Sequence, residues 1–160
     1  MDFSYSPRVE ALRQQLWQFM DRYILPRLGA WRAEVSAGQY PVSFMEDLKE
    51  LARDEGLWNL FLPSLKDGEP GTRLSNLEYA PLAEIMGRVP WASEVFNCNA
   101  PDTGNMEVLH MFGSEAQKAH WLEPLMRAET RSAFAMTEVA LELKQQQEQL
   151  DRVSAYLAGA

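Results

Sequence analysis

A serine followed three residues later by glutamate or glutamine occurs repeatedly in this chain and marks the beginnings of helices. Three such pairs precede apolar residues at helical spacing, namely Ser43 with Glu46, Ser75 with Glu78, and Ser114 with Gln117. In such a capping box, each side chain binds a backbone amide that the first turn of a helix leaves unpaired. Helix starts spread along 160 residues favour a chain built of several short helices.

Apolar residues at helical spacing indicate two further helices. Ser6 is a suitable N-cap, and Pro7 occupies the first helical position, where its missing amide costs nothing. Met106, Leu109 and Phe112 recur on one face of a second segment. Because the connections between the segments are short, we predict an all-α fold, a small bundle of about five helices.

The C-terminal part of the chain carries two different patterns. Residues 132–137 (SAFAMT) are apolar and aromatic, which predicts one short strand. Residues 139–160 place apolar side chains near helical spacing opposite a face rich in glutamine and glutamate, which predicts an amphipathic helix. This tail helix is expected to dock on the domain, to cover the end of the strand, or to pair with another chain.

Composition excludes some classes of protein. The formal net charge of −8 argues against a nucleic-acid or anionic-membrane binder, because both need a basic surface. No apolar run approaches the length of a membrane span, and no cluster of metal-ligating residues is present in the sequence. Cys98 is the single cysteine, so no internal disulfide can form, and a cytoplasmic location is expected.

Two stretches of the sequence are typical of a known family. Residues 113–138 read GSEAQKAHWLEPLMRAETRSAFAMTE, and residues 96–109 read FNCNAPDTGNMEVL. Both resemble the acyl-CoA dehydrogenases, in particular their long-chain and multidomain branch. The resemblance implies that residues 1–138 form the N-terminal helical domain and the first strand of a following β domain. Residues 139–160 depart from the family pattern.

The resemblance also implies an activity. Acyl-CoA dehydrogenases use FAD to remove two hydrogens from the α and β carbons of an acyl-CoA thioester. Their catalytic glutamate lies in a C-terminal domain that would follow Ala160, so we expect no catalytic residue and no metal site in this chain. The chain is expected to be inactive alone and to need a complementing chain, with a homo-oligomer as the other possible partner.

The resemblance assigns the flavin to the predicted strand. Phe134, Met136 and Thr137 correspond to positions that lie beside the isoalloxazine ring, and backbone amides with a hydroxyl can tune such a ring. The alternative is a buried edge strand that binds no ligand, because short apolar runs are common.

The resemblance assigns the wall of the acyl cavity to the loop before Met106. Asn97, Asn99 and Asp102 offer donors and acceptors there. The alternative is that these side chains only cap the next helix and hold turns.

A second function belongs to a different class. The helical domain with its tail could be a non-catalytic interaction or oligomerisation module. A stable dimer without flavin would favour this alternative, whereas activity restored by a complementing chain would favour the enzyme.

Overall fold

The computed structural model describes residues 4–63, 65, 67–69 and 71–134. Its helices are α1 (Pro7–Phe19), α2 (Leu28–Ser36), α3 (Met45–Asp54), α4 (Asn76–Met86), α5 (Ala92–Val95), α6 (Asp102–Phe112), α7 (Glu115–Gln117) and α8 (Glu123–Met126). Two π-helical turns, η1 (Met20–Ile24) and η3 (Lys118–Leu122), and one 3-10 turn, η2 (Leu25–Arg27), continue these helices. The described residues contain no strand, and the all-α prediction is confirmed.

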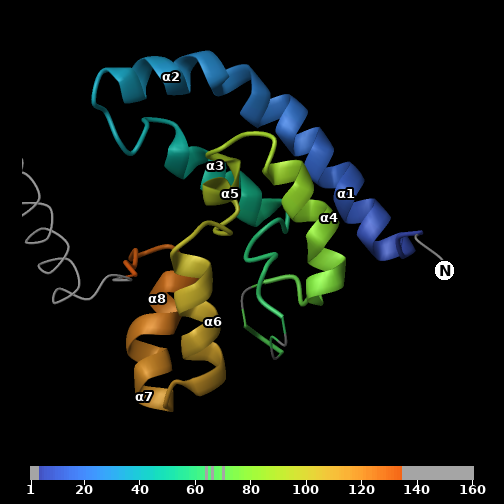
Figure 1. The fold of residues 1–160 in the computed structure, drawn as a ribbon, viewed down its shortest axis with the longest axis vertical. Coiled ribbons are helices and arrows are strands. Elements are labelled where there is room, and N and C mark those ends of the chain that lie inside the picture. The colour runs from blue at the N-terminus through green and yellow to red at the C-terminus, as the bar shows by residue number, and fades with distance from the viewer. Residues whose placement is uncertain (1–3, 64, 66, 70, 135–160) are drawn as a thin grey trace, which may run out of the picture.

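The helices form two parts, which Figure 1 shows one above the other. In the upper part, which we call the body, α1 and α2 form a long arch, α4 lies along α1, and α3 packs with α5. In the lower part, which we call the hairpin, α6 runs beside the continuous segment made of α7, η3 and α8. Five helices have nine or more residues, as the prediction of about five implied.

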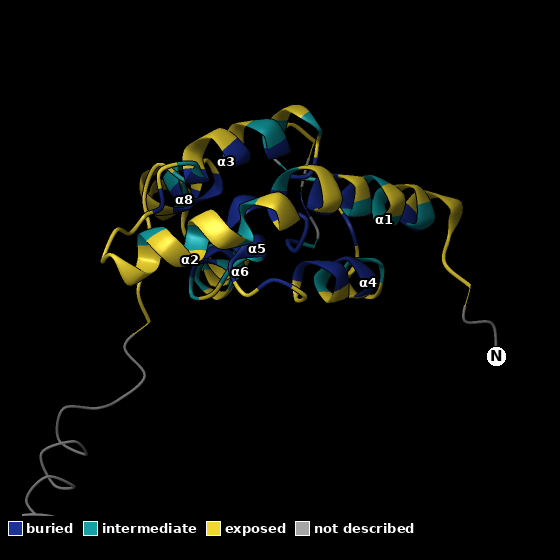
Figure 2. Ribbon diagram, turned by 90° about the horizontal axis from the view of Figure 1, so that it is seen from above, coloured by how far each residue is buried: buried dark blue, intermediate teal, exposed yellow. Residues whose placement is uncertain are grey.

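The core lies between the helices of the body. Figure 2 shows the buried faces of α1, α3 and α4 turned toward one another, whereas α2 is mostly exposed. Leu16, Phe19, Leu48 and Phe96 are completely or almost completely buried, and the ring of Phe19 meets the edge of Phe96 at a centroid distance of 5.1 Å. Each such side chain contributes about 2 kcal/mol through the hydrophobic effect.

Two of the three predicted capping boxes are present. Ser75 with Glu78 begins α4, and Ser114 with Gln117 begins α7, each with both reciprocal hydrogen bonds. Ser6 also caps α1, by accepting a hydrogen bond from the amide of Val9. Local sequence therefore determined these helix starts.

The prediction of a third capping box, formed by Ser43 and Glu46, is wrong. The amide and hydroxyl of Ser43 both donate to the carboxylate of Glu34, at 2.6 and 2.8 Å. Glu46 instead pairs with Lys49 at 2.7 Å, and α3 begins at Met45 without a side-chain cap. A carboxylate from the preceding helix has therefore taken the place of Glu46 at the Ser43 amide, while Glu46 is held by Lys49.

The expected strand at 132–137 is not seen over its first three residues, which have no regular secondary structure. The amide of Ser132, which a strand would direct to a neighbouring strand, donates to the carboxylate of Asp102 at 2.7 Å. The rest of this strand and the expected helix at 139–160 lie outside the described residues.

Candidate functional site

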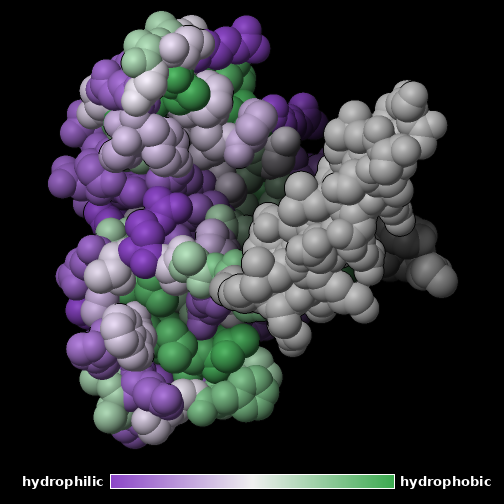
Figure 3. Space-filling view, turned by 60° about the vertical axis from the view of Figure 1, so that its left-hand side comes forward, coloured by the Kyte–Doolittle hydropathy of each residue, from purple (hydrophilic) through white to green (hydrophobic). Residues whose placement is uncertain are grey.

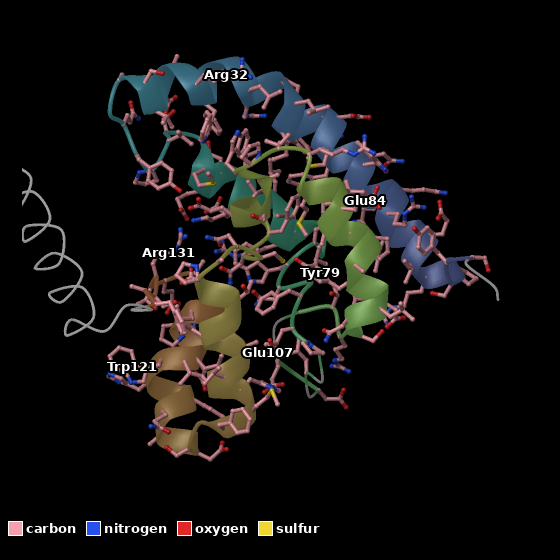
Figure 4. All side chains as sticks on the ribbon, viewed as in Figure 1. Arg32, Tyr79, Glu84, Glu107, Trp121 and Arg131 are labelled. Carbon is pink, nitrogen blue, oxygen red and sulfur yellow. The ribbon has the colours of Figure 1, made fainter. Side chains whose placement is uncertain are left out.

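The exit segment, residues 131–134, is fastened to two helices by one arginine. Arg131 donates through Nε to Asp102 Oδ2 at 2.7 Å and through Nη1 to Glu94 Oε1 at 2.6 Å. Glu94 belongs to α5 in the body, and Asp102 is the first residue of α6 in the hairpin. Figure 4 shows Arg131 where the body and the hairpin meet. A single guanidinium therefore joins three parts of the chain.

Both carboxylates in this joint are buried, whereas the arginine is half exposed. The side chains of Glu94 and Asp102 are 7% and 2% exposed, and that of Arg131 is 44% exposed. Burial opposes the charge on the guanidinium, but its hydrogen bonds and charge interactions with Glu94 and Asp102 outweigh that effect and raise the pKa of Arg131. The arginine is therefore held in its charged form.

Asp102 uses its second oxygen to bind the residue after Arg131. Oδ1 accepts the amide of Ser132 at 2.7 Å and its hydroxyl at 2.6 Å. Asn105, one turn further along α6, donates to the same hydroxyl at 2.8 Å. Because Asp102 lies in the first turn of α6, the partial positive charge of the helix N-terminus also favours its carboxylate.

Glu94 extends this network toward the surface of the body. Tyr40 donates its hydroxyl to Glu94 Oε2, and Lys49 Nζ lies 3.8 Å from Oε1. The Tyr40 ring is largely exposed, but burial of its phenol end and the hydrogen bond to Glu94 raise the pKa of Tyr40 to about 12. Tyr40 therefore remains a neutral donor to Glu94 at physiological pH.

A cavity of about 340 Å³ lies beside Glu94. It is lined by Trp31, Tyr40, Pro90, Trp91, Ser93, Glu94, Asn99 and Ala100. The two indole rings stack with a centroid distance of 6.1 Å and an interplanar angle of 12°. The volume is near the lower end of the range for small-molecule sites, roughly 300–1,000 Å³. The lining therefore combines an aromatic wall with the polar side chains of Tyr40, Ser93, Glu94 and Asn99.

The three predicted cavity residues occupy different environments. Asn99 lines the cavity, whereas Asp102 directs both oxygens to Arg131 and Ser132. Asn97 is 3% exposed and donates to Asn59 Oδ1 at 2.8 Å and to the carbonyl of Leu125 at 3.0 Å. The structure thus brings one of the three to the cavity and gives the other two partners within the fold.

Among the residues assigned to the flavin, Phe134 alone falls within the described part of the chain. Its side chain is 65% exposed, and the cavity beside Glu94 is lined by other residues. Met136 and Thr137 lie outside the described residues. The described residues do not by themselves enclose a flavin. The same residues contain no group of three side chains placed to hold a metal ion, and no helix long and apolar enough to cross a membrane.

Sequence reasoning missed Arg131, Glu94 and Tyr40. A possible signal was Glu94, a charged residue inside the apolar run from Trp91 to Phe96. Its partners are 37 and 54 residues away in the chain, so no local spacing could have revealed them.

The sequence of this chain is similar to those of known proteins. The chain matches the family described as "Acyl-CoA dehydrogenase, N-terminal domain" over residues 6–129. It is 52% identical to acyl-CoA dehydrogenase family member 10 of Mus musculus over 137 residues, which are 83% of this chain and 13% of that relative. It is 47% identical over 146 residues to a Mycobacterium tuberculosis protein assigned as an acyl-CoA dehydrogenase, with 88% of this chain and 34% of the relative covered.

A solved structure agrees with the fold. A Mycobacterium abscessus protein assigned as an acyl-CoA dehydrogenase superposes with a TM-score of 0.77 and is 48% identical in sequence. The match covers 85% of this chain and 35% of that protein. The chain therefore spans about a third or less of the length of these three relatives.

Proposed function

Because the chain belongs to the acyl-CoA dehydrogenase family and contains its N-terminal domain, we propose that it is the N-terminal part of an enzyme that uses FAD to dehydrogenate acyl-CoA thioesters. The observation that carries this proposal is the match over residues 6–129 together with the structural superposition. In this proposal, residues 1–138 are the family part and residues 139–160 are an added helical tail. We retain a cytoplasmic location as part of the proposal.

The cavity beside Glu94 is the proposed contribution of this chain to the acyl site. Asn99 and Ala100 line it immediately before α6, and the stacked rings of Trp31 and Trp91 provide an apolar wall. Asn97 and Asp102 bind other parts of the fold, so their proposed part in the acyl site is to hold the loop that contains Asn99 and Ala100 in place. The remaining lining includes polar side chains, so in this proposal the hydrocarbon chain lies against the indole rings.

FAD would accept the hydride from the substrate in the complete enzyme. Phe134, Met136 and Thr137 are the residues of this chain proposed to lie beside it. Because Phe134 is exposed and the described residues form no enclosure around it, we propose that the cofactor is held mainly by domains outside this chain. We propose no catalytic residue here, and the isolated chain is proposed to be inactive.

Complementation tests this function. The 160-residue chain is mixed with a fragment of the Mycobacterium abscessus protein that lacks the part matched by this chain, and acyl-CoA-dependent reduction of a dye is followed in the presence of FAD. Activity is expected in the mixture and in neither component alone. Turnover by the isolated chain, or an inactive mixture in which the two chains bind each other, would contradict the proposal.

An interaction module is the second candidate, and one observation favours it. In the hairpin, α6 and η3 expose large apolar side chains, namely Val108, Met111, Phe112 and Trp121. Figure 3 shows apolar surface gathered over the lower part of the molecule, where the hairpin lies. Exposed apolar surface of this kind marks an interface. A stable dimer in sedimentation experiments, without gain of activity in the mixture, would favour this function over the first.

A further inference from the structure

Three consecutive residues of the exit segment are each bound to the hairpin or the body. Arg131 binds α5 and α6, Ser132 binds Asp102 through its amide and hydroxyl, and the carbonyl of Ala133 accepts from Asn105 Nδ2 at 3.4 Å. Connecting segments on a protein surface are generally more mobile than the elements that they join. This density of bonds fixes the direction in which the chain leaves the domain.

The charges around Arg131 show why arginine suits this position. Glu94 and Asp102 are buried carboxylates on different helices, and the planar guanidinium donates to both through separate nitrogens. A lysine ammonium is a single point charge and cannot reproduce this fork. Lys49 stands 3.8 Å from Glu94 and is itself paired with Glu46, so it does not replace Arg131.

Arg127, four residues earlier, provides an internal comparison. Its side chain is 48% exposed, against 44% for Arg131, so the two arginines are almost equally open to solvent. The side chain of Arg127 pairs with Glu123 and Glu129, which are both exposed and close in sequence. The two side chains are matched in exposure and differ in their partners. The backbone at Arg127 is also bound, because its carbonyl accepts from Arg53 Nη2 at 3.0 Å and the amide of Ala128 donates to the carbonyl of Leu125 at 3.0 Å.

We infer that Arg131 and Asp102 are positioning residues that set the exit segment in place before any other domain is present. Resting on the proposed function, this inference gives the pair a role: they present Phe134, the first residue assigned to the flavin, at a fixed place beside the N-terminus of α6. Neither residue is assigned a contact with substrate or cofactor. They act through the three bonded residues between α8 and Phe134.

Limited trypsin digestion of the full chain tests this inference, because trypsin cleaves after arginine and needs the bond to leave its bound conformation. The rates of cleavage after Arg131 and after Arg127 are followed separately by mass spectrometry. Each bond is compared with the same bond in the variants, because the backbone at Arg127 is itself hydrogen-bonded at the end of α8.

Asp102→Asn keeps the shape and one acceptor while it removes the charge. It is expected to speed cleavage after Arg131 about tenfold and to leave cleavage after Arg127 unchanged. The matched control, Glu129→Gln, is expected to change cleavage after Arg127 alone. Asp102→Glu is expected to restore part of the protection. Unchanged cleavage after Arg131 in Asp102→Asn would overturn the inference.

A milder variant guards against general unfolding. Ser132→Ala removes the hydroxyl that binds Asp102 and Asn105 and retains the amide, so cleavage after Arg131 is expected to rise by about threefold without change elsewhere. A uniform rise at every arginine would show loss of fold and would count against a positioning role. The digestion requires neither FAD nor acyl-CoA, so its failure is separate from failure of the complementation experiment.

Discussion

Among the contacts that join the hairpin to the body, two clusters of side chains, which we call joints, use opposite chemistry. The amide joint consists of Asn59 and Asn97, which bind each other and the carbonyls of Leu125 and Met126 at the end of α8. The ionic joint consists of Glu94, Asp102 and Arg131. The first is neutral and buried, whereas the second is charged and half open to solvent.

The amide joint is built into the backbone. Asn59 and Asn97 have φ values of +50° and +53°, a left-handed conformation that asparagine tolerates better than most residues. The indole of Trp58 adds a hydrogen bond to the carbonyl of Met126 at 2.8 Å. Because every partner is uncharged or a backbone group, this joint should be insensitive to salt.

The ionic joint depends on a balance of charges. Two buried carboxylates are expensive to desolvate, and the guanidinium offsets that cost only while it remains in place. We therefore expect the two joints to have different roles. The amide joint holds the hairpin on the body, and the ionic joint holds the exit segment on both.

Removal of the Asn97 amide should have the largest effect on stability. Asn97→Ala is expected to lower the free energy of unfolding by about 3 kcal/mol, because it leaves buried acceptors without donors and places alanine at a positive φ. Asn97→Gly removes the same donors without the backbone strain and should cost about 1 kcal/mol less. Urea denaturation measures both. Equal losses for the two variants would show that the left-handed backbone plays no part.

Removal of the Arg131 guanidinium should have the second-largest effect on stability. Arg131→Met is expected to cost about 2 kcal/mol, less than for a fully buried pair because water reaches the arginine. The control Arg127→Met should cost much less, since its partners are exposed. If the two variants are equally stable in urea, the ionic joint has no special role.

Alkaline pH should lower the free energy of unfolding through Cys98, the buried residue that follows Asn97. Burial raises the pKa of the Cys98 thiol from an ordinary value of 9.0 to about 12. The unfolded thiol therefore loses its proton from about pH 9 while the folded thiol keeps it, so stability is lost as pH rises from 9 toward 12.

The expected slope is about 1.4 kcal/mol per pH unit once the unfolded thiol is fully ionised, with about 1 kcal/mol lost between pH 9 and pH 10. Cys98→Ala should remove this part of the slope, whatever its cost at neutral pH. Unfolding curves at the two pH values give the comparison, and parallel slopes for the two chains would contradict the assignment.

Salt should have the smallest effect on stability, and that effect should differ between the two joints. At about 1 M NaCl, the cost of Arg131→Met is expected to shrink by about 0.5 kcal/mol, while the cost of Asn97→Ala stays the same. Denaturation of the same variants at low and high salt measures both changes. A salt dependence of the Asn97 variant would mean that the amide joint is coupled to charged groups.

The same contrast explains what could be predicted from the sequence. Capping boxes at Ser75 and Ser114 are local, and the sequence predicted them correctly. At Ser43 a carboxylate from the preceding helix replaced the local partner. The strand expected from 132 onward failed in its described part for the same reason, since a distant Asp102 takes the amide of Ser132.

The candidate site was less predictable than the fold. Asn99 lines the cavity beside Glu94, and its assignment to an acyl site stays a prediction. The arginine that fastens the exit segment was not foreseen. Ion pairs across 29 and 37 residues leave no periodic trace in a sequence. They follow from the way α5, α6 and α8 pack, which only the folded chain reveals.

Titration with FAD tests most directly whether this chain is one domain of a larger flavoenzyme. Flavin fluorescence is followed as FAD is added to the purified 160-residue chain, alone and mixed with the complementary fragment of the Mycobacterium abscessus protein. The account predicts saturable binding in the mixture that exceeds binding by the fragment, and no saturable binding by the chain alone. Tight, saturable binding by the chain alone would contradict it and would make this chain a flavoprotein in its own right.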